Sequence, residues 1–117
     1  MGQKSHRRYH LIIDAQNCLP EKLTDEKLLD AFIRQLAQKI EMKILAGPYI
    51  IKGEPYNPGI TAFTIIDFSH ISIHTFTKDN EFCLDIFSCK EFNHEMAVNF
   101  VKETFELKDE QMNVINV

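Results

Sequence analysis

Residues 60–88 read ITAFTIIDFSHISIHTFTKDNEFCLDIFS, and this stretch decides the fold. It holds three apolar runs, at residues 60–68, 70–76 and 82–88, which are rich in the β-branched and aromatic residues typical of strands. The polar residues 78–80 (KDN) separate the last two runs and predict a hairpin. In the middle run, Ile alternates with His and Ser, as is typical of a strand with one buried face. We therefore predict three consecutive strands.

Two stretches on either side have the spacing of amphipathic helices. Residues 24–41 place apolar side chains at helical intervals, and Thr24 is the predicted N-cap. Asp25 and Glu26 suit the positive end of that helix dipole. A second helix is predicted over residues 93–105, with an apolar stripe formed by Met96, Ala97, Phe100, Val101 and Phe105.

Shorter segments complete the predicted order of elements. Strands are predicted at residues 9–14, 43–52 and 112–117, the second interrupted at Gly47-Pro48. Residues 53–59 (GEPYNPG) are dense in turn formers and are predicted as a loop, and a polar turn is predicted around Pro20. Strands grouped into hairpins, with helices that must cover one face, favour the α+β class. We expect a two-layer sandwich with a mainly antiparallel sheet and two helices on one face.

Length, composition and charge limit the class of protein. At 117 residues, with 44% hydrophobic and 26% charged residues, the chain is expected to form a single globular domain over residues 1–117. A net charge of -4 and a pI near 5.7 argue against nucleic acid or an anionic membrane as the main partner. No apolar run reaches the ~18–20 residues that cross a bilayer, and none near the basic N-terminus suits a signal peptide. We expect a cytoplasmic protein.

The apolar residues of the predicted sheet suggest an oligomer. The run at residues 60–68 is apolar on both faces of the strand that it predicts. Helices can cover only one of these faces in a two-layer sandwich. We therefore expect a homodimer or a higher homo-oligomer that buries part of the second face.

The polar residues of the middle strand could belong to a metal site or to a nucleophilic site. His70 and His74 point the same way, but four residues of strand separate their Cα atoms by ~13 Å, too far to share one ion. We therefore expect no metal site. Ser69, close to a His and a thiol, is compatible with nucleophilic chemistry, although no G-x-S-x-G elbow surrounds it. Cys18 and Cys83 suit core positions, since the cysteines are odd in number and form no C-x-x-C pair.

Several motifs stand at fixed intervals along the chain. They are SHISIHTF at residues 69–76, DIFSC at residues 85–89, GITA at residues 59–62 and YHLIID at residues 9–14. In order and interval they resemble motifs of the bacterial and archaeal S-adenosylmethionine decarboxylases, whose central motif is commonly E-S-H-[IL]-[ST]-I-H-[TS]-[WF]-P-E. The resemblance covers most of the chain. It implies an α/β sandwich whose protomers pair into dimers.

The resemblance also implies a self-processing enzyme of polyamine (spermidine) biosynthesis. Family members cut their own chain before the motif serine and convert that serine into a covalent pyruvoyl group. Here Ser69 would attack the Phe68 carbonyl, and the pyruvoyl group would form a Schiff base with the substrate and accept electrons as carbon dioxide leaves. His74 matches the processing histidine and Thr61 a serine that assists the acyl shift. Cys89 matches the acid that protonates the product.

Three positions differ from the family motif. Phe68 stands where the family usually has Glu, and Lys90 stands where a Gly often follows the motif Cys. Lys78 replaces a Glu that holds the ribose hydroxyls of S-adenosylmethionine, and a lysine offers only hydrogen-bond donors. Asp79, one position further along the turn, is a candidate replacement acceptor.

These departures leave alternatives open. The same chemistry could act on L-arginine or L-ornithine, whose distal cation needs acidic partners. The chain could also be a non-processing, non-catalytic paralogue with a binding or regulatory role, or an unrelated hydrolase or metal protein. The candidate substrate-binding residues are Asp14, Asp67, Phe76, Asp79 and Asp85.

Overall fold

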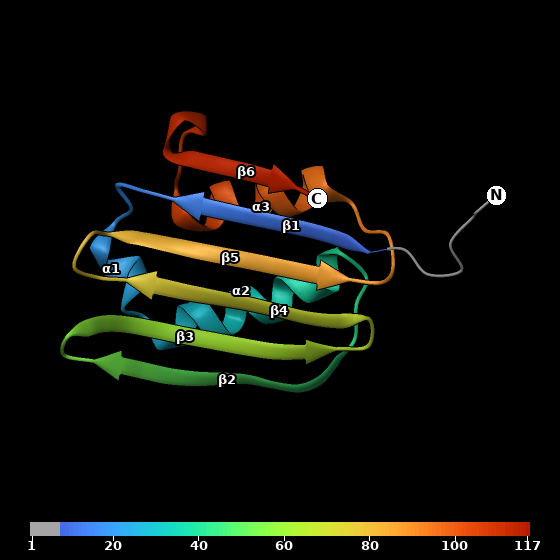
Figure 1. Cartoon of the computed structure of the whole chain (residues 1–117), viewed down its shortest axis with the longest axis horizontal. Helices are drawn as coiled ribbons and strands as arrows, with labels where there is room; N and C mark the ends of the chain where they lie inside the picture. Colours follow the sequence, from blue (N-terminus) through green and yellow to red (C-terminus); the bar gives the residue numbers. More distant parts are fainter. Residues whose placement is uncertain (1–7) are drawn as a thin grey trace.

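The computed structural model describes residues 8–117 and shows one sheet with helices on one face (Figure 1). The strands are β1 (Tyr9–Ala15), β2 (Ile44–Glu54), β3 (Asn57–Ile66), β4 (Ser69–Phe76), β5 (Glu81–Ser88) and β6 (Met112–Asn116). The helices are α1 (Pro20–Leu23), α2 (Glu26–Lys39) and α3 (His94–Phe105), and a 3₁₀ turn, η1 (Asp109–Gln111), precedes β6. The expected α+β class is confirmed. Most of the basic N-terminal stretch lies outside the described residues.

All neighbouring strands of the sheet are antiparallel, in the order β2-β3-β4-β5-β1-β6. The quoted stretch of residues 60–88 supplies most of a β3-β4-β5 meander, as its three apolar runs predict. The N-terminal strand β1 lies between β5 and β6 (Figure 1). Strand β4 is therefore inside the sheet, paired on both edges.

Alternate residues of β4 face different surroundings. Ile71 and Ile73 are fully buried beneath the helices, in a core that includes Leu36, Phe82 and Phe105. Burial of an Ile side chain of this kind stabilises a fold by about 1.5–3 kcal/mol. The other set of β4 side chains, which includes His70 and His74, lies on the face without helices. The helices thus fix which face of the sheet is available for chemistry.

The start of α2 differs from the prediction. The N-cap is Asp25, whose carboxylate accepts a hydrogen bond of 3.0 Å from the Leu28 N–H, so the prediction of Thr24 was wrong. The reason is that Pro20–Leu23 forms a short helix in place of the predicted polar turn, and Thr24 ends it. A proline is favoured at the first position of a helix, because the missing N–H costs nothing there.

Helix α3 begins close to its predicted residue. The Asn93 side chain caps it by accepting a hydrogen bond of 2.9 Å from the Met96 N–H. Three members of the predicted apolar stripe, Ala97, Val101 and Phe105, are buried against the sheet and α2. Met96 was also part of the predicted stripe, but it is 42% exposed and does not belong to the buried side of α3, so its predicted core position was wrong.

The prediction of a loop over residues 53–59 was also wrong. Strand β2 continues to Glu54 and β3 begins at Asn57, so a tight hairpin replaces most of that loop. The glycine at residue 59 serves strand packing, because a Cβ there would overlap the Thr75 carbonyl of β4. This close approach fixes how the start of β3 lies against β4.

The face of the sheet without helices carries exposed apolar side chains. On β2, Tyr49 is 53% exposed and Ile51 is 64% exposed, and Phe63 and Ile65 of β3 are also exposed. Tyr49 lies beside Phe63 in the sheet register. We call these four residues the open-face apolar patch. No helix among residues 8–117 is long and apolar enough to span a membrane.

Candidate active site

Ser69 lies at the first position of β4, directly after the two-residue turn formed by Asp67 and Phe68. Its φ angle is 144°, a value that residues other than glycine rarely adopt. Such a conformation costs on the order of 1–3 kcal/mol and persists only where the surroundings impose it. The peptide bond between Phe68 and Ser69 therefore closes a strained turn. Contacts with the surrounding residues must keep the turn in this conformation.

The Phe68 carbonyl accepts a hydrogen bond of 3.0 Å from the Cys89 N–H. This contact forms because Ser88, the last residue of β5, is the register partner of Ser69. The carbonyl is the one that a Ser69 hydroxyl would attack, and the N–H points at the oxygen that would gain charge. The Cys89 side chain is exposed, and the thiol is free. The structure therefore brings Ser69 and Cys89 to the same end of the sheet.

Asp67 holds the other side of the same turn. Its carboxylate accepts a hydrogen bond of 3.1 Å from the Lys43 N–H, and its own N–H donates one of 2.9 Å to the Lys43 carbonyl. Asp67 was a candidate substrate ligand. The structure shows its side chain engaged with the main chain between α2 and β2.

Thr61 and His74 form a second pair on the open face of the sheet. They are register partners on β3 and β4, and Thr61 Oγ1 lies 2.8 Å from His74 Nδ1 in a hydrogen bond. His74 is exposed and Thr61 is half-buried. An exposed imidazole that is oriented by a hydroxyl can act as a general acid or base.

One chain does not bring these two pairs together. Ser69 and His74 are five residues apart on the same extended strand, a separation of about 16 Å. Within the described chain, the predicted catalytic residues form two pairs at opposite ends of β4: Ser69 with Cys89, and Thr61 with His74.

Asp85 already has partners in the middle of the open face. His10 Nε2 lies 2.8 Å from its carboxylate, and His70 Nε2 lies 4.0 Å away. The His70 ring stacks between Phe63 and Phe87, with ring centres 5.4 Å and 5.7 Å apart. Asp85 and the two phenylalanine rings are thus the partners of His10 and His70. In residues 8–117, no cluster of three His, Cys, Asp or Glu side chains could hold one.

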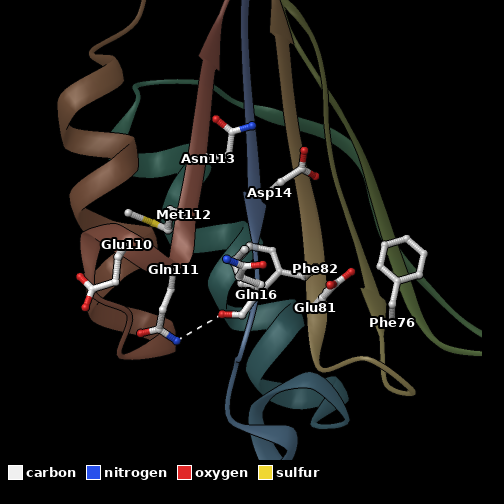
Figure 2. A pocket seen from close by; sticks show the side chains of 10 residues that line it. Asp14, Gln16, Phe76, Glu81, Phe82, Glu110, Gln111, Met112 and Asn113 are labelled. Carbon is white, nitrogen blue, oxygen red and sulfur yellow. Dashed lines mark hydrogen bonds between the residues drawn. The ribbon is translucent and has the colours of Figure 1, made fainter.

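A pocket of about 350 Å³ lies at the end of the sheet away from Ser69 (Figure 2). Asp14 and Phe76, two candidate substrate ligands, both line it. Glu81, Glu110 and Asn113 line it as well, and none of the three was singled out from the sequence. Alternation could have identified Glu81, which shares a face with Asp85 on β5. Nothing in the sequence indicated that the 3₁₀ turn would add Glu110.

The β4–β5 turn carries Lys78 and Asp79, which are both exposed. This turn lies at the same end of β4 as His74. The structure therefore places Lys78, which differs from the family motif, at the pocket end of the sheet.

Two thiols have strongly raised pKa values. Burial raises the pKa of Cys18 to about 11, assisted by the negative charge of Glu81. Burial also raises the pKa of Cys83 to about 11, with a hydrogen bond to Asp14 and the charges of Asp14 and Asp85 adding to the effect. Both thiols are therefore protonated at neutral pH and poorly reactive. Cys18 is buried in the core, as predicted. Cys83 is only partly buried and lies on the same face of β5 as Asp85, outside the core, so its predicted core position was wrong.

Comparison with known proteins gives consistent similarities. A family model described as S-adenosylmethionine decarboxylase matches residues 9–116. An S-adenosylmethionine decarboxylase proenzyme from Pyrococcus furiosus is 31% identical over 86% of this chain and 70% of its own. One from Clostridium botulinum is 31% identical over 86% of this chain and 84% of its own.

A solved structure is similar in fold. The crystal structure of the adenosylmethionine decarboxylase from Aquifex aeolicus superposes with a TM-score of 0.79 at 14% identity. It covers 97% of this chain and 91% of that protein. The similarity of fold therefore extends over nearly the whole chain.

Proposed function

Because the chain belongs to the S-adenosylmethionine decarboxylase family, we propose that it is made as a proenzyme and decarboxylates S-adenosylmethionine with a pyruvoyl group derived from Ser69. The observation that carries this proposal is the strained Ser69, preceded by a carbonyl that accepts the Cys89 N–H. The family model and the two proenzymes confirm the family and the enzyme class that were expected from the sequence. The names of the matched relatives do not favour a basic amino-acid substrate or a non-catalytic paralogue.

Self-cleavage uses groups at the Ser69 end of β4. The Ser69 hydroxyl attacks the Phe68 carbonyl carbon, the C–N bond breaks as the C–O bond forms, and the hydroxyl proton ends on the freed amine. The Cys89 N–H stabilises the charge that develops on the carbonyl oxygen. Release of strain at Ser69 favours the same direction. β-Elimination then breaks the Cβ–O bond of the ester, which frees fragment 1–68 with a carboxylate end and leaves dehydroalanine at residue 69. Its imine tautomer is hydrolysed by water, which releases ammonia and leaves fragment 69–117 with a pyruvoyl end.

The residues around Ser69 fit a pyruvoyl group. Ser69 is half-buried at the start of a strand, and the exposed Cys89 follows the strand paired with it. A pyruvoyl group supplies the electron sink for decarboxylation of an α-amino acid. We assign Cys89 as the residue that delivers a proton to the product, because its thiol is free and lies at this end of the sheet.

Substrate recognition is assigned to the opposite end of the sheet. Asp14 and Glu81 bring carboxylates to the pocket beside Phe76, and Glu110 lies at its edge (Figure 2). S-adenosylmethionine carries a sulfonium and an ammonium, which such carboxylates attract. Lys78 cannot accept hydrogen bonds from ribose, so Asp79 is the assigned acceptor in that turn.

We also propose that a second copy of the chain completes the site. His74 and Thr61 are too far from Ser69 within one chain, and the open-face apolar patch lies on the same face as they do. Two sheets that pair face to face about a two-fold axis can place the His74 end of one copy over the Ser69 end of the other. Each dimer would then contain two complete sites.

The first experiment tests the reaction. Intact-mass analysis of purified protein should give two fragments matching residues 1–68 and 69–117, the second with a pyruvoyl N-terminus. The processed protein should release carbon dioxide from S-adenosylmethionine but not from L-arginine or L-ornithine. A single full-length species that persists after long incubation would refute the proposed function.

The second experiment tests the shared site. Neither Ser69→Ala nor His74→Ala should process alone. Co-expressed, the two variants should form mixed dimers in which the His74→Ala chain is cleaved, because Ser69 and His74 then meet from different copies. Absence of cleavage in a confirmed mixed dimer would contradict a shared site. The cytoplasmic location expected from the sequence stays a prediction, to be checked by cell fractionation.

A further inference from the structure

We propose that Asp67 and Lys90 are positioning residues for self-cleavage, which hold the turn before Ser69 in its strained conformation from two sides. This inference rests on the function proposed above and adds two side chains to it. Neither residue is among the catalytic residues assigned above. Both act on the bond between Phe68 and Ser69 through contacts with the turn itself.

Asp67 ties one side of the turn to the segment that connects α2 to β2. The two hydrogen bonds that it exchanges with the Lys43 main chain, 3.1 Å and 2.9 Å long, form a closed pair. The carboxylate serves here only as an acceptor of an N–H. An asparagine side chain can also accept that hydrogen bond, whereas alanine cannot.

Lys90 holds the other side of the turn. Its ammonium lies 5.2 Å from the centre of the Phe68 ring and donates a hydrogen bond of 3.2 Å to the Glu41 carbonyl. Its main chain is fixed as well, because the Lys90 N–H and carbonyl both hydrogen-bond to Ser88 Oγ, at 2.9 Å and 2.7 Å. The lysine side chain therefore crosses the Phe68 ring and joins the end of β5 to the turn after α2.

The two anchors enclose the carbonyl that reacts. The Phe68 ring is under Lys90, and the Phe68 carbonyl accepts the Cys89 N–H. Phe68 and Lys90 are also two of the positions where this chain differs from the quoted motif, so their contact is a feature of this chain. Because Lys90 contacts its ring and the Cys89 N–H binds its carbonyl, Phe68 has little freedom to rotate.

Strain explains why anchors affect the rate. Ser69 keeps its φ angle of 144° only while neighbouring contacts prevent the turn from relaxing. When an anchor is lost, more molecules adopt relaxed turns in which the hydroxyl is badly placed for attack. The population that can react falls, although no reacting group has been removed.

The test is a time course of cleavage in precursor made by cell-free synthesis and followed by intact mass. Lys90→Met keeps the length of the side chain and removes its charge. The loss of one partly exposed cation–π contact predicts cleavage about two- to five-fold slower. Asp67→Ala should slow cleavage by a similar or larger factor. Once processed fully, both variants should show the KM and kcat of the parent protein.

Conservative variants separate positioning from a general loss of structure. Asp67→Asn and Lys90→Arg retain the acceptor and the cation, and both should cleave at close to the parent rate. Lys39→Met is the matched control, because Lys39 lies 5.0 Å over the Phe100 ring between the helices, in a contact of the same kind away from the turn. It should cleave at the parent rate. Melting temperatures will show whether Asp67→Ala is folded, and Lys90, on the surface, carries little risk of misfolding.

Two outcomes would overturn the inference. In one, Lys90→Met and folded Asp67→Ala cleave as fast as the parent chain. In the other, Asp67→Asn and Lys90→Arg are as slow as the disruptive variants. Failure of the parent chain to cleave would instead refute the proposed function, so the two failures are distinguishable.

Discussion

The two ends of β4 differ in what they carry. At the Ser69 end are a strained residue, a carbonyl bound by a main-chain N–H and an exposed thiol. At the other end are a hydrogen-bonded Thr61–His74 pair and a pocket lined by carboxylates. The first end has the groups that react, and the second has a proton carrier and a place for a substrate. Neither end contains a full set, which is why we infer that two copies combine them.

The largest expected effect is at the Ser69 end. Ser69→Ala removes the nucleophile and should abolish cleavage, so that only the full-length chain of 117 residues is seen by intact mass. Ser72→Ala is the matched control, since Ser72 lies on the same strand away from the turn, and it should be cleaved normally. Fragments from Ser69→Ala would place the reaction at another residue.

Cys89 should separate cleavage from turnover. Cys89→Ala keeps the main-chain N–H that binds the Phe68 carbonyl, so the chain should still be cut. Loss of the thiol that supplies a proton should lower kcat by about 10²–10⁴-fold. Carbon dioxide release from the fully processed variant measures this effect. Normal turnover would refute the role of Cys89 as the acid.

Thr61 tests whether the distant end takes part in cleavage. Thr61→Val keeps the shape of the side chain and removes the hydroxyl that bonds His74, so processing should slow by about 10²–10³-fold. Thr64→Val is the control on the same strand. The Thr64 hydroxyl is buried and has no hydrogen-bond partner, so that variant should process normally and be at least as stable. Equal processing rates for the two variants would leave the Thr61 end without a role in cleavage.

The smallest effect concerns the thiols at the two ends. The pKa of Cys83, which lies beside Asp14, is raised from 9.0 to about 11, as is that of buried Cys18. At pH 8 a disulfide reagent should therefore label Cys89 first and the other two slowly. Mass spectrometry of labelled peptides identifies each site. Rapid labelling of Cys83 at pH 8 would contradict its raised pKa.

The same shifts predict the direction of a stability change. In the unfolded chain these thiols lose protons near pH 9, while in the folded chain they keep them until about pH 11. The unfolded state therefore binds fewer protons over this interval, and the free energy of unfolding falls as pH rises from 9 to 11. Below pH 9 their contribution is fully present. Urea titrations across this range measure the change, which should shrink in Cys83→Ala.

Local pattern predicted most of the fold. The strands and the two long helices follow from periods of two and of 3.6 residues, which arise from neighbours along the chain. The wrong predictions concern segments whose structure depends on contacts with other parts of the chain. Thr24 is not the N-cap of α2, because it ends a short helix. Residues 53–59 form most of a hairpin in place of a loop, and Gly59 within it packs closely against β4.

The candidate site was predictable in part, for a similar reason. Thr61 and His74 are equally distant from the turn at residues 67–68, so simple folding back of the chain predicts their contact. The contacts of Asp67 and Phe68 come from residues 24 and 22 positions away, and no local pattern encodes them. The sequence also does not predict the positive φ angle of Ser69. The strain and its anchors were visible only in three dimensions.

The position of β1 has a consequence for the mature protein. Cleavage after residue 68 would leave β1, β2 and β3 in one chain and β4, β5 and β6 in the other. The strand order β2-β3-β4-β5-β1-β6 then inserts β1 of the first chain between two strands of the second (Figure 1). The products are interleaved, so they cannot separate without dismantling the sheet. The precursor carries β1 to β6 in one chain, but the cut protein must refold by association of two different chains, which becomes less favourable on dilution.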